Sequence, residues 1–270
     1  MTRNSEAGGG DPAVRARSVS VYRDSLRALG EVTFDLAAGC SMAVIGPNGS
    51  GKSTLLAAIA GLLEPRTGSL EVAARRRRGG VALVLQSTDI ERSLPITVRE
   101  TVQMARYPSL GLLRRCRPGD RKAVDSALDR VEMRDREWSQ IQELSGGQRQ
   151  RVMVAQGIAQ QADLLLLDEP LTGLDVVSAR TISEIMHAEK RTGRTVVFTT
   201  HDLGDAGTAD VVLLLNTDQV AFGPPEDVLA AEPLREAFGG SVLQLDNGSV
   251  VLDDPHHAHS PQEQGHVHGR

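Results

Sequence analysis

Residues 46–54 of the chain read GPNGSGKST, a glycine-rich run of the form G-x-x-x-x-G-K-S/T. The run follows the apolar segment SMAVI and leads into a helical pattern, so a buried strand would direct it at a helix N-terminus. Backbone N–H groups of such a loop and the positive end of the helix dipole suit phosphate oxygens. Lys52 would supply a charge to the β- and γ-phosphates and Ser53 a hydroxyl ligand to Mg²⁺. The sequence therefore predicts that the chain binds a nucleoside triphosphate. The residues that this pattern places against the nucleotide are Gly46, Pro47, Asn48, Gly49, Ser50, Gly51, Lys52, Ser53 and Thr54.

Polar residues also follow other runs of strand character. Residues 164–167 are all leucine and lead into Asp168 and Glu169, the run TVVFT leads toward His201, and VVLLL forms a third run. Short, mainly apolar runs are typical of strands buried on both faces of a parallel sheet. Helical patterns separate these runs, which predicts a doubly wound α/β core. Ligands of such sheets bind beyond the carboxyl ends of the strands, so we expect these polar side chains to converge with Lys52.

The stretch from about residue 90 to residue 162 has helical periodicity and lacks comparable strand runs. We interpret it as a mostly helical subdomain inserted into the core. It contains LSGGQ at residues 144–148, in which Ser145 is suited to cap the following helix and the glycines leave the first N–H groups open to an anion. The chain thus presents a second helix N-terminus suited to phosphate.

Composition sets the limits of these predictions. The chain has 270 residues, 40% hydrophobic residues and a formal net charge of −5, which suits a sizeable core and does not indicate nucleic-acid binding. Cys40 and Cys116 have no spacing typical of a metal or redox site. No apolar run reaches the roughly 18–20 residues of a membrane helix. The polar N-terminal residues lack the apolar segment of a signal peptide. After the phosphate loop, apolar residues at helical spacing predict a helix that reaches about residue 63: Leu55, Leu56, Ile59, Leu62 and Leu63.

Taken in order, GPNGSGKST, Gln86, LSGGQ, LLLLDEP and His201 resemble the ATP-binding subunits of ABC transporters, and the resemblance runs from about Ser18 to Gly240. It implies an α/β fold: a P-loop NTPase core with a parallel sheet, an antiparallel β subdomain and an inserted helical signature subdomain. It also implies boundaries. We expect a disordered lead over 1–15, the ATPase domain over 16–240 with its helical subdomain at about 90–162, and a C-terminal extension over 241–270.

The resemblance assigns roles by position. Residues Gly46 to Thr54 would cradle the phosphates of ATP, and Ser53 and Asp168 would bind Mg²⁺, Asp168 through water. Gln86 would be a catalytic residue that senses Mg²⁺ and water while it touches the membrane partner. Glu169 would polarise the attacking water, and His201 would contact the γ-phosphate. Ser145 and Gly147 would contact the γ-phosphate held by a second copy, and Asp175 would link the two sites. Tyr22 lies at about the family's spacing for an aromatic that stacks on adenine; packing in a β-like stretch is the other interpretation.

The resemblance also implies partners and a location. Two ATP-binding subunits would form a head-to-tail homodimer, with one ATP between the phosphate loop of one copy and the signature of the other. Integral membrane permease subunits would bind the dimer, so the chain would lie peripherally on the cytoplasmic face of the membrane. An extracytoplasmic metal-binding protein would deliver the substrate to an importer of this kind.

The prediction of the substrate depends on sequence segments that are less diagnostic than LSGGQ. Residues 94–107, 220–225 and 234–240 resemble manganese/zinc/iron-type importers and are partly shared with iron-siderophore and cobalamin importers. The segment before Gln86 and the leucine at position 94 depart from many relatives. The tail carries five of the seven histidines, and imidazole suits transition metals, but a polar disordered tail explains the same composition. The histidines of the tail are His256, His257, His259, His266 and His268.

Other classes of ABC protein fit less well. Chromosome-type ATPases carry a long coiled coil between the two halves, for which the spacing from Lys52 to Leu144 leaves no room. Translation-type ATPases carry two cassettes per chain, whereas this sequence contains one set of the cassette motifs. A regulatory cassette that does not hydrolyse ATP is disfavoured by Glu169 and His201.

Overall fold

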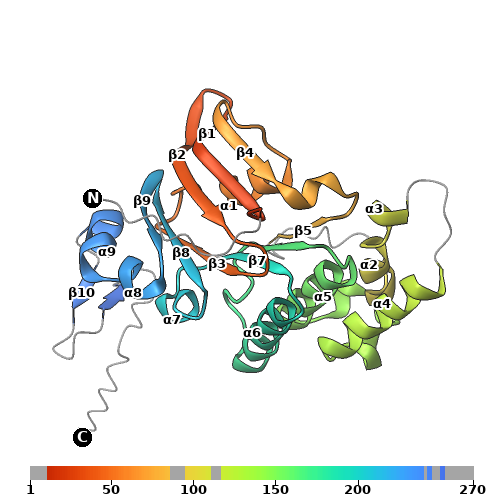
Figure 1. Ribbon diagram of the computed structural model, residues 1–270. Helices are drawn as coiled ribbons and strands as arrows, with labels where there is room; N and C mark the ends of the chain where they lie inside the picture. Colours follow the sequence, from red (N-terminus) through yellow and green to blue (C-terminus); the bar gives the residue numbers. More distant parts are fainter. Residues whose placement is uncertain (1–10, 86–94, 111–116, 240–241, 245–249, 253–270) are drawn as a thin grey trace, which may run out of the picture.

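The computed structural model describes residues 11–85, 95–110, 117–239, 242–244 and 250–252. Its centre is a six-stranded sheet in the order β5-β6-β7-β3-β8-β9 (Figure 1). Strands β5, β6, β7, β3 and β8 pair in parallel, and β9 is antiparallel to β8. The expected parallel core is therefore confirmed. The strand bounds are β3 (Ser41–Ile45), β5 (Val81–Val84), β6 (Leu164–Leu167), β7 (Thr195–Thr199), β8 (Val211–Asn216) and β9 (Asp218–Gly223).

A second sheet is antiparallel and has the order β2-β1-β4. It consists of β1 (Val14–Arg23), β2 (Leu26–Leu36) and β4 (Thr67–Val72). A short 3-10 helix (Ala73–Arg76) connects β4 to β5. Strand β1 begins before residue 16, where we expected the domain to start. The reason is that Val14 is fully buried and pairs with Leu36 and Val72.

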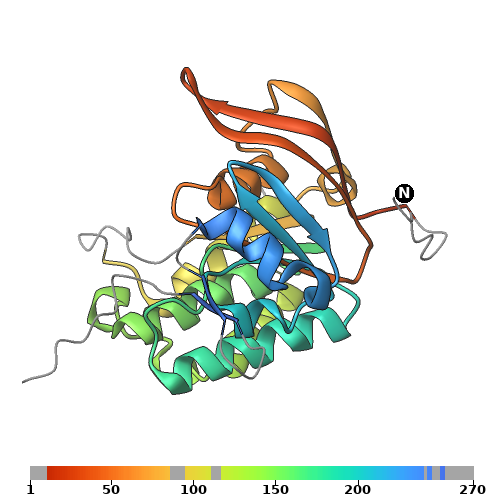
Figure 2. The same cartoon turned by 90° about the vertical axis from the view of Figure 1, so that its left-hand side faces the viewer.

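The two faces of the six-stranded sheet carry different layers. In β3, Met42 and Val44 pack with the antiparallel sheet and helix α1 (Lys52–Ala60), whereas Ala43 and Ile45 pack with the layer of helices α5 (Gly146–Ala159) and α6 (Val176–Arg191). This alternation is the period-2 pattern of a strand buried on both faces. The two ribbon views agree, with the antiparallel sheet on one side and α5 and α6 on the other (Figure 2).

Helix α1 is shorter than the apolar spacing predicted. Gly61 adopts a left-handed conformation (φ 83°) and its N–H bonds the last turn, so the helix ends at Ala60. A glycine in this position is a common helix stop because it lacks the Cβ that disfavours positive φ. Leu62 therefore lies outside the helix and is 67% exposed.

The inserted helical subdomain consists of α2 (Val98–Met104), α3 (Tyr107–Leu110), α4 (Pro118–Arg130) and the signature helix α5, joined by 3-10 turns at Arg134–Arg136 and Ile141–Glu143. Helix α5 packs against α2, α4, α6 and β5. A capping box of Thr97 and Glu100 starts α2, which satisfies N–H groups that have no partner inside the helix.

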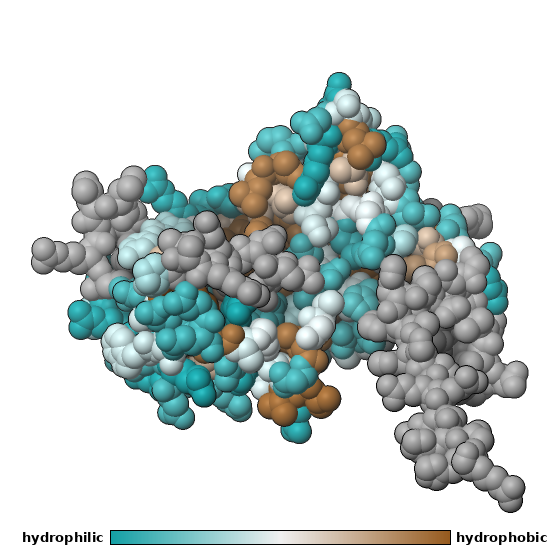
Figure 3. Space-filling view, turned by 180° about the vertical axis from the view of Figure 1, so that it is seen from behind, coloured by the Kyte–Doolittle hydropathy of each residue, from teal (hydrophilic) through white to brown (hydrophobic). Residues whose placement is uncertain are grey.

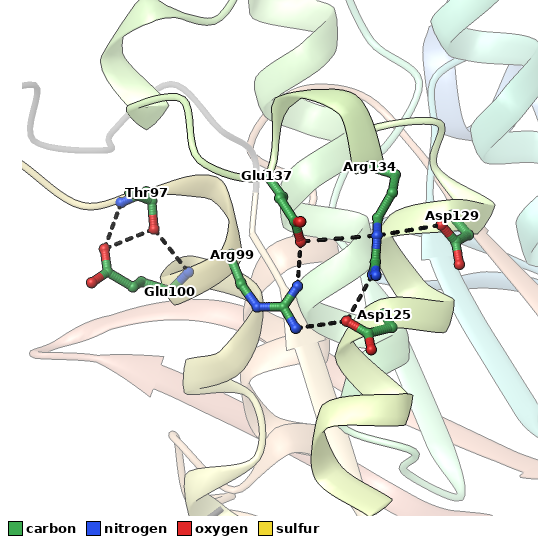
Figure 4. A network of polar contacts seen from close by, with 7 residues as sticks. All are labelled: Thr97, Arg99, Glu100, Asp125, Asp129, Arg134 and Glu137. Carbon is green, nitrogen blue, oxygen red and sulfur yellow. Dashed lines mark hydrogen bonds and ion pairs between the residues drawn. The ribbon is translucent and has the colours of Figure 1, made fainter. Parts of the chain in front are cut away.

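A polar network fixes the position of α2 in this subdomain (Figure 4). The Arg99 guanidinium lies between Asp125 of α4, at 2.6 Å, and Glu137. Asp125 also bonds Arg134 at 2.7 Å. The pKa of Asp125 is lowered, because these two arginine partners outweigh the effect of burial. The network ties α2, α4 and the turn after α4 into one unit that carries the signature helix.

The C-terminal part adds α7 (Leu203–Ala206), α8 (Pro225–Val228), α9 (Ala231–Phe238) and a hairpin of β10 (Val242–Gln244) and β11 (Val250–Leu252). Gln86 and the five histidines of the tail lie outside the described residues. Among the helices described, none is long and apolar enough to cross a membrane. On the face shown in Figure 3, hydrophobic residues form separate patches among hydrophilic ones.

A buried carboxylate joins the helical subdomain to the core. Glu189, near the end of α6, is 0% exposed and forms ion pairs with Arg130 of α4 and Arg194 before β7. Burying a carboxylate is costly unless cations compensate it, and here two arginines do so. The two arginines therefore hold α4 against the end of α6.

We expect Glu189→Ala to lower the free energy of unfolding by about 2–3 kcal/mol. This lies at or below the ~3–5 kcal/mol typical of breaking a buried pair, because both arginines keep some contact with water. Urea denaturation followed by circular dichroism measures the change. Glu184→Ala is the matched control on the same helix, since its exposed pair with Arg180 should contribute less than about 1 kcal/mol. Equal effects of the two substitutions would contradict the prediction.

Candidate nucleotide-binding site

The phosphate loop leaves the carboxyl end of β3 and opens helix α1, as predicted. Two of its glycines are required by close packing. Gly46 has φ 150°, and a Cβ there would collide with the carbonyl oxygen of Leu215 and approach the Ser50 hydroxyl at 2.7 Å. Gly51 has φ 98°, and a Cβ there would lie 2.6 Å from the Ala28 carbonyl oxygen. Only glycine fits such conformations at this density, so the neighbouring strands β2 and β8 hold the loop in shape.

Lys52, the first residue of α1, folds back over its own loop. Its Nζ donates hydrogen bonds to the carbonyl oxygens of Gly46 at 2.8 Å and Pro47 at 3.1 Å, and the residue is only 6% exposed. Burial lowers the pKa of Lys52, and the nearby carboxylates of Glu169 and Asp168 oppose that shift. The ammonium group is therefore held inside the loop and lies within the field of the acidic pair.

The remaining loop residues differ in their exposure. Ser53 is exposed, whereas Thr54 is buried. The Ser50 hydroxyl is buried and finds no hydrogen-bond partner among the described residues. Buried polar atoms are nearly always satisfied in proteins, so this hydroxyl suits a loop that closes on a polar ligand. Asn48 and Gly49 are exposed at the tip.

The acidic pair follows β6, two strands away from the phosphate loop in the sheet order. Asp168 is 8% exposed, and its Oδ1 accepts a hydrogen bond from the Thr199 hydroxyl at 2.7 Å. The same hydroxyl accepts a bond from the Glu169 N–H at 2.7 Å. Glu169 has φ 45°, a left-handed conformation that costs a non-glycine residue on the order of 1 kcal/mol. Tertiary contacts must therefore hold this turn.

His201 follows β7, the strand between β6 and β3. The residue is exposed and lines a cleft of about 160 Å³ together with Thr172, Gly173 and Thr199. Asp202 caps the short helix α7 by accepting from the Asp205 N–H at 2.8 Å. The cleft thus lies between the segment after the acidic pair and the end of β7.

The signature segment begins α5 as predicted. Ser145 caps the helix: its hydroxyl accepts from the Gln148 N–H at 3.3 Å, and its own N–H bonds the Gln148 side chain at 3.0 Å. A Cβ at Gly147 would lie 2.6 Å from both Asp175 Oδ2 and Ser178 Oγ. The small residue therefore allows α5 to begin directly against the start of α6.

Asp175 caps α6 within the same chain. Its carboxylate accepts from the Ser178 N–H at 2.9 Å and from the Ser178 hydroxyl at 2.8 Å. The first of these bonds is the main reason that the pKa of Asp175 is lowered. The starts of α5 and α6 thus lie together, and the structure brings Ser145, Gly147 and Asp175 into one region.

Tyr22 lies in β1, and its position relative to the loop follows from strand register. Tyr22 pairs with Arg27, and the preceding Val21 pairs with Leu29, the residue against which Gly51 packs. The tyrosine therefore follows directly after the residue that pairs with Leu29, the neighbour of the phosphate loop. The Arg66 guanidinium lies 4.7 Å from its ring centroid, which is a cation–π distance.

The sequence motifs did not indicate two of the residues that organise this site. Thr199 and Ser178 are both nearly inaccessible, at 0% and 2% exposure, and each bonds a predicted site residue. The strand TVVFT begins and ends with threonine, and the position of Thr199 at its carboxyl end was the only available signal. The expected position of Gln86 lies outside the described residues.

The arrangement suits phosphoryl chemistry with a hard cation. Oxygen ligands from a hydroxyl and a carboxylate are what Mg²⁺ prefers, and Ser53 and Asp168 are of this kind. Parallel strands place Lys52, the acidic pair and His201 at the same edge of the sheet, because each follows a carboxyl strand end. Charge neutralisation and positioning are the main demands of phosphoryl transfer.

Comparison with known proteins agrees with this geometry. The family model "ABC transporter" matches residues 29–172. The chain is 35% identical over 246 residues to a manganese transport system ATP-binding protein of Halalkalibacterium halodurans, covering 90% of this chain and 98% of that protein. It is 39% identical over 220 residues to a zinc transport system ATP-binding protein of Treponema pallidum, covering 79% and 82%.

A solved structure of an ABC transporter described as metal-chelate type, in an inward-facing conformation, superposes with a TM-score of 0.76 at 28% identity. The match covers 89% of this chain and 95% of that one. Family model, sequence relatives and fold agree along most of the chain. The chain therefore belongs to the ATP-binding subunits of the ABC transporter family and is an ATPase.

Proposed function

We propose that this ATPase drives the import of a divalent metal ion, manganese, zinc or iron, through separate membrane permease subunits. The observation that carries the ATPase part is the placement of Lys52 in the field of Asp168 and Glu169 beside a phosphate loop. The substrate is supported by relatives named for manganese and zinc transport over most of the chain. Residues 16–240 would form the ATPase domain, together with the start of β1 at Val14, and 241–270 would form a C-terminal extension.

In this proposal the residues divide the work of ATP hydrolysis. Residues 46–54 bind the phosphates, and Lys52 neutralises charge on the β- and γ-phosphates. Mg²⁺, held by Ser53, Asp168 and Gln86, would neutralise the developing phosphate charge. Glu169 orients and polarises the attacking water. His201 contacts the γ-phosphate, and Tyr22 stacks on adenine.

We propose that two copies assemble head to tail. Helix α1, which begins at the phosphate loop, and α5, which begins at the signature, pack on opposite faces of the six-stranded sheet. A second copy could therefore supply Ser145 and Gly147 to the ATP of the first, while Asp175 connects the sites. Permease subunits would hold the dimer on the cytoplasmic face of the membrane.

The metal itself would pass through the permease after delivery by an extracytoplasmic metal-binding protein. Within the described part of the chain, no group of three or more His, Cys, Asp or Glu side chains could hold a metal ion. The histidine-rich tail lies outside that part. The proposal for the substrate therefore depends on the named relatives and on the sequence segments at 94–107, 220–225 and 234–240.

We expect Glu169→Gln to lower ATP turnover by at least about 100-fold, because general-base assistance contributes on that order. ATP binding should remain, since the substitution keeps the shape of the side chain and leaves the phosphate loop intact. Phosphate release and nucleotide titration measure the two effects. Glu184→Gln, an exposed position on α6, is the control. Turnover near the parent rate in Glu169→Gln would remove this residue from the proposed role.

We expect the Glu169→Gln variant to shift from monomer to dimer when Mg²⁺ and ATP are added, because bound ATP would bridge the phosphate loop and the partner's signature. Light scattering over a range of protein concentrations measures the mass. Ser145→Arg should abolish the shift by placing a bulky side chain at the start of α5. A mass that is independent of ATP at every concentration argues against the head-to-tail dimer.

For the substrate, we expect deletion of the gene to lower the cellular content of manganese, zinc or iron, most strongly in metal-poor medium. Elemental analysis of washed cells measures this. Complementation with the parent gene should restore the metal content, whereas the Glu169→Gln gene should not. Unchanged metal content together with altered uptake of an organic solute would reject the metal and leave the ATPase assignment intact.

A further inference from the structure

Thr199 lies at the junction of the elements that form the ATPase site. It is the last residue of β7, between β6 and β3 in the sheet, and it is 0% exposed. Its register partner in β3 is Val44, two residues before the phosphate loop. Phe198 pairs with Leu167, the residue before Asp168. The side chain is thus enclosed between the strand that ends in the loop and the strand that ends in the acidic pair.

The Thr199 hydroxyl makes one donor and one acceptor bond to consecutive residues. It donates to Asp168 Oδ1 at 2.7 Å and accepts from the Glu169 N–H at 2.7 Å. A hydroxyl group can do both at once, because it has one proton and two lone pairs. Both bonds are short, and the one to a carboxylate is of the stronger class.

The bond to Glu169 restrains an uncommon backbone conformation. Glu169 has φ 45°, which side chains with a Cβ seldom adopt. Such conformations persist where the surroundings over-determine them, and they occur most often at functional sites. The Thr199 hydroxyl accepts the N–H of this residue, so it fixes the direction in which the Glu169 side chain leaves the backbone.

We propose that Thr199 is the positioning residue of the acidic pair, so that one buried hydroxyl aligns the Mg²⁺ ligand and the residue that orients water. This inference rests on the roles proposed above for Asp168 and Glu169. Residues that orient a metal ligand from behind typically change metal affinity or activity 10- to 100-fold when replaced. Thr199 does not itself touch the nucleotide in this proposal.

The test compares three variants of the full chain. Thr199→Val keeps the shape of the side chain and removes both hydrogen bonds, whereas Thr199→Ser keeps the hydroxyl. Thr195→Val is the matched control: Thr195 is 3% exposed in the same strand, and its hydroxyl accepts from the Gly39 N–H at 3.0 Å, at the opposite end of β7. Thermal unfolding of all variants reports whether the fold is retained.

We expect Thr199→Val to lower kcat by about 10- to 100-fold and to raise the Mg²⁺ concentration for half-maximal ATPase by a similar factor. ATP binding measured in EDTA should change less than about twofold, because the phosphate loop makes no bond to this hydroxyl. Thr199→Ser should stay within about threefold of the parent in both quantities. Thr195→Val should match the parent.

Parent-like kcat and Mg²⁺ dependence in Thr199→Val would overturn the proposal, and so would equal losses in Thr199→Val and Thr199→Ser. If Thr199→Val does not fold, Thr199→Ser and Thr199→Cys decide, because the serine hydroxyl should preserve Mg²⁺ dependence and the weakly bonding thiol should not. Glu169→Gln distinguishes a failure of this inference from a failure of the proposed function. Full activity of Glu169→Gln would contradict the proposed function. An inactive Glu169→Gln together with a parent-like Thr199→Val would contradict only the role of Thr199.

Discussion

The parallel pairing of β6, β7 and β3 is the constraint on which the site depends. Leu167 pairs with Phe198, and Thr199 pairs with Val44, so three strands end at the same level. The backbone bonding continues past the strand ends, where the Thr200 N–H donates to Val44 O at 3.2 Å and the Asp168 N–H donates to Val84 O at 2.9 Å. A shift of one residue in this register would turn every side chain of a strand to the opposite face. The phosphate loop, the acidic pair and the histidine turn would then no longer meet.

Charge balance is the second requirement of this edge of the sheet. Burial disfavours the charged form of Lys52 and so lowers its pKa. The nearby carboxylates of Glu169 and Asp168 partly offset this effect. A bound triphosphate adds several negative charges beside these carboxylates. One lysine cannot neutralise them all, which gives a physical reason for a divalent cation with oxygen ligands at the same place. The Thr199 hydroxyl bears on this balance because it orients one of the carboxylates.

The signature region depends on the close packing of two helix N-termini. Helices α5 and α6 begin side by side, and each has its own side-chain cap, Ser145 in one case and Asp175 in the other. The approach is so close that a Cβ at position 147 would displace the Asp175 carboxylate, which caps α6, and the Ser178 hydroxyl bonded to it. Because Glu189 and the Arg99 network tie the helical subdomain together and to the core, the start of α5 is held in a defined orientation. In a head-to-tail dimer that orientation would determine how the signature meets the partner's ATP.

Local sequence determined four strands of the central sheet (β3, β6, β7 and β8), the phosphate loop and the start of the signature helix. Runs such as LLLL at 164–167 have no polar residue that could face water, and GPNGSGKST places glycines where the backbone needs positive φ or close approach. Ser145 and Gln148 are three residues apart, so their capping box was also readable from the chain. These features depend on neighbours a few residues away, which the sequence shows directly.

Tertiary structure decided the rest. The ion pairs of Glu189 with Arg130 and Arg194, and the contact of Gly147 with Asp175 and Ser178, join residues whose partners no local pattern names. The role of Thr199 is the clearest case, because its two bonds reach residues 30 and 31 positions away in the chain. Only the order of strands in the sheet brings that hydroxyl to the acidic pair, and a single sequence contains no record of that order.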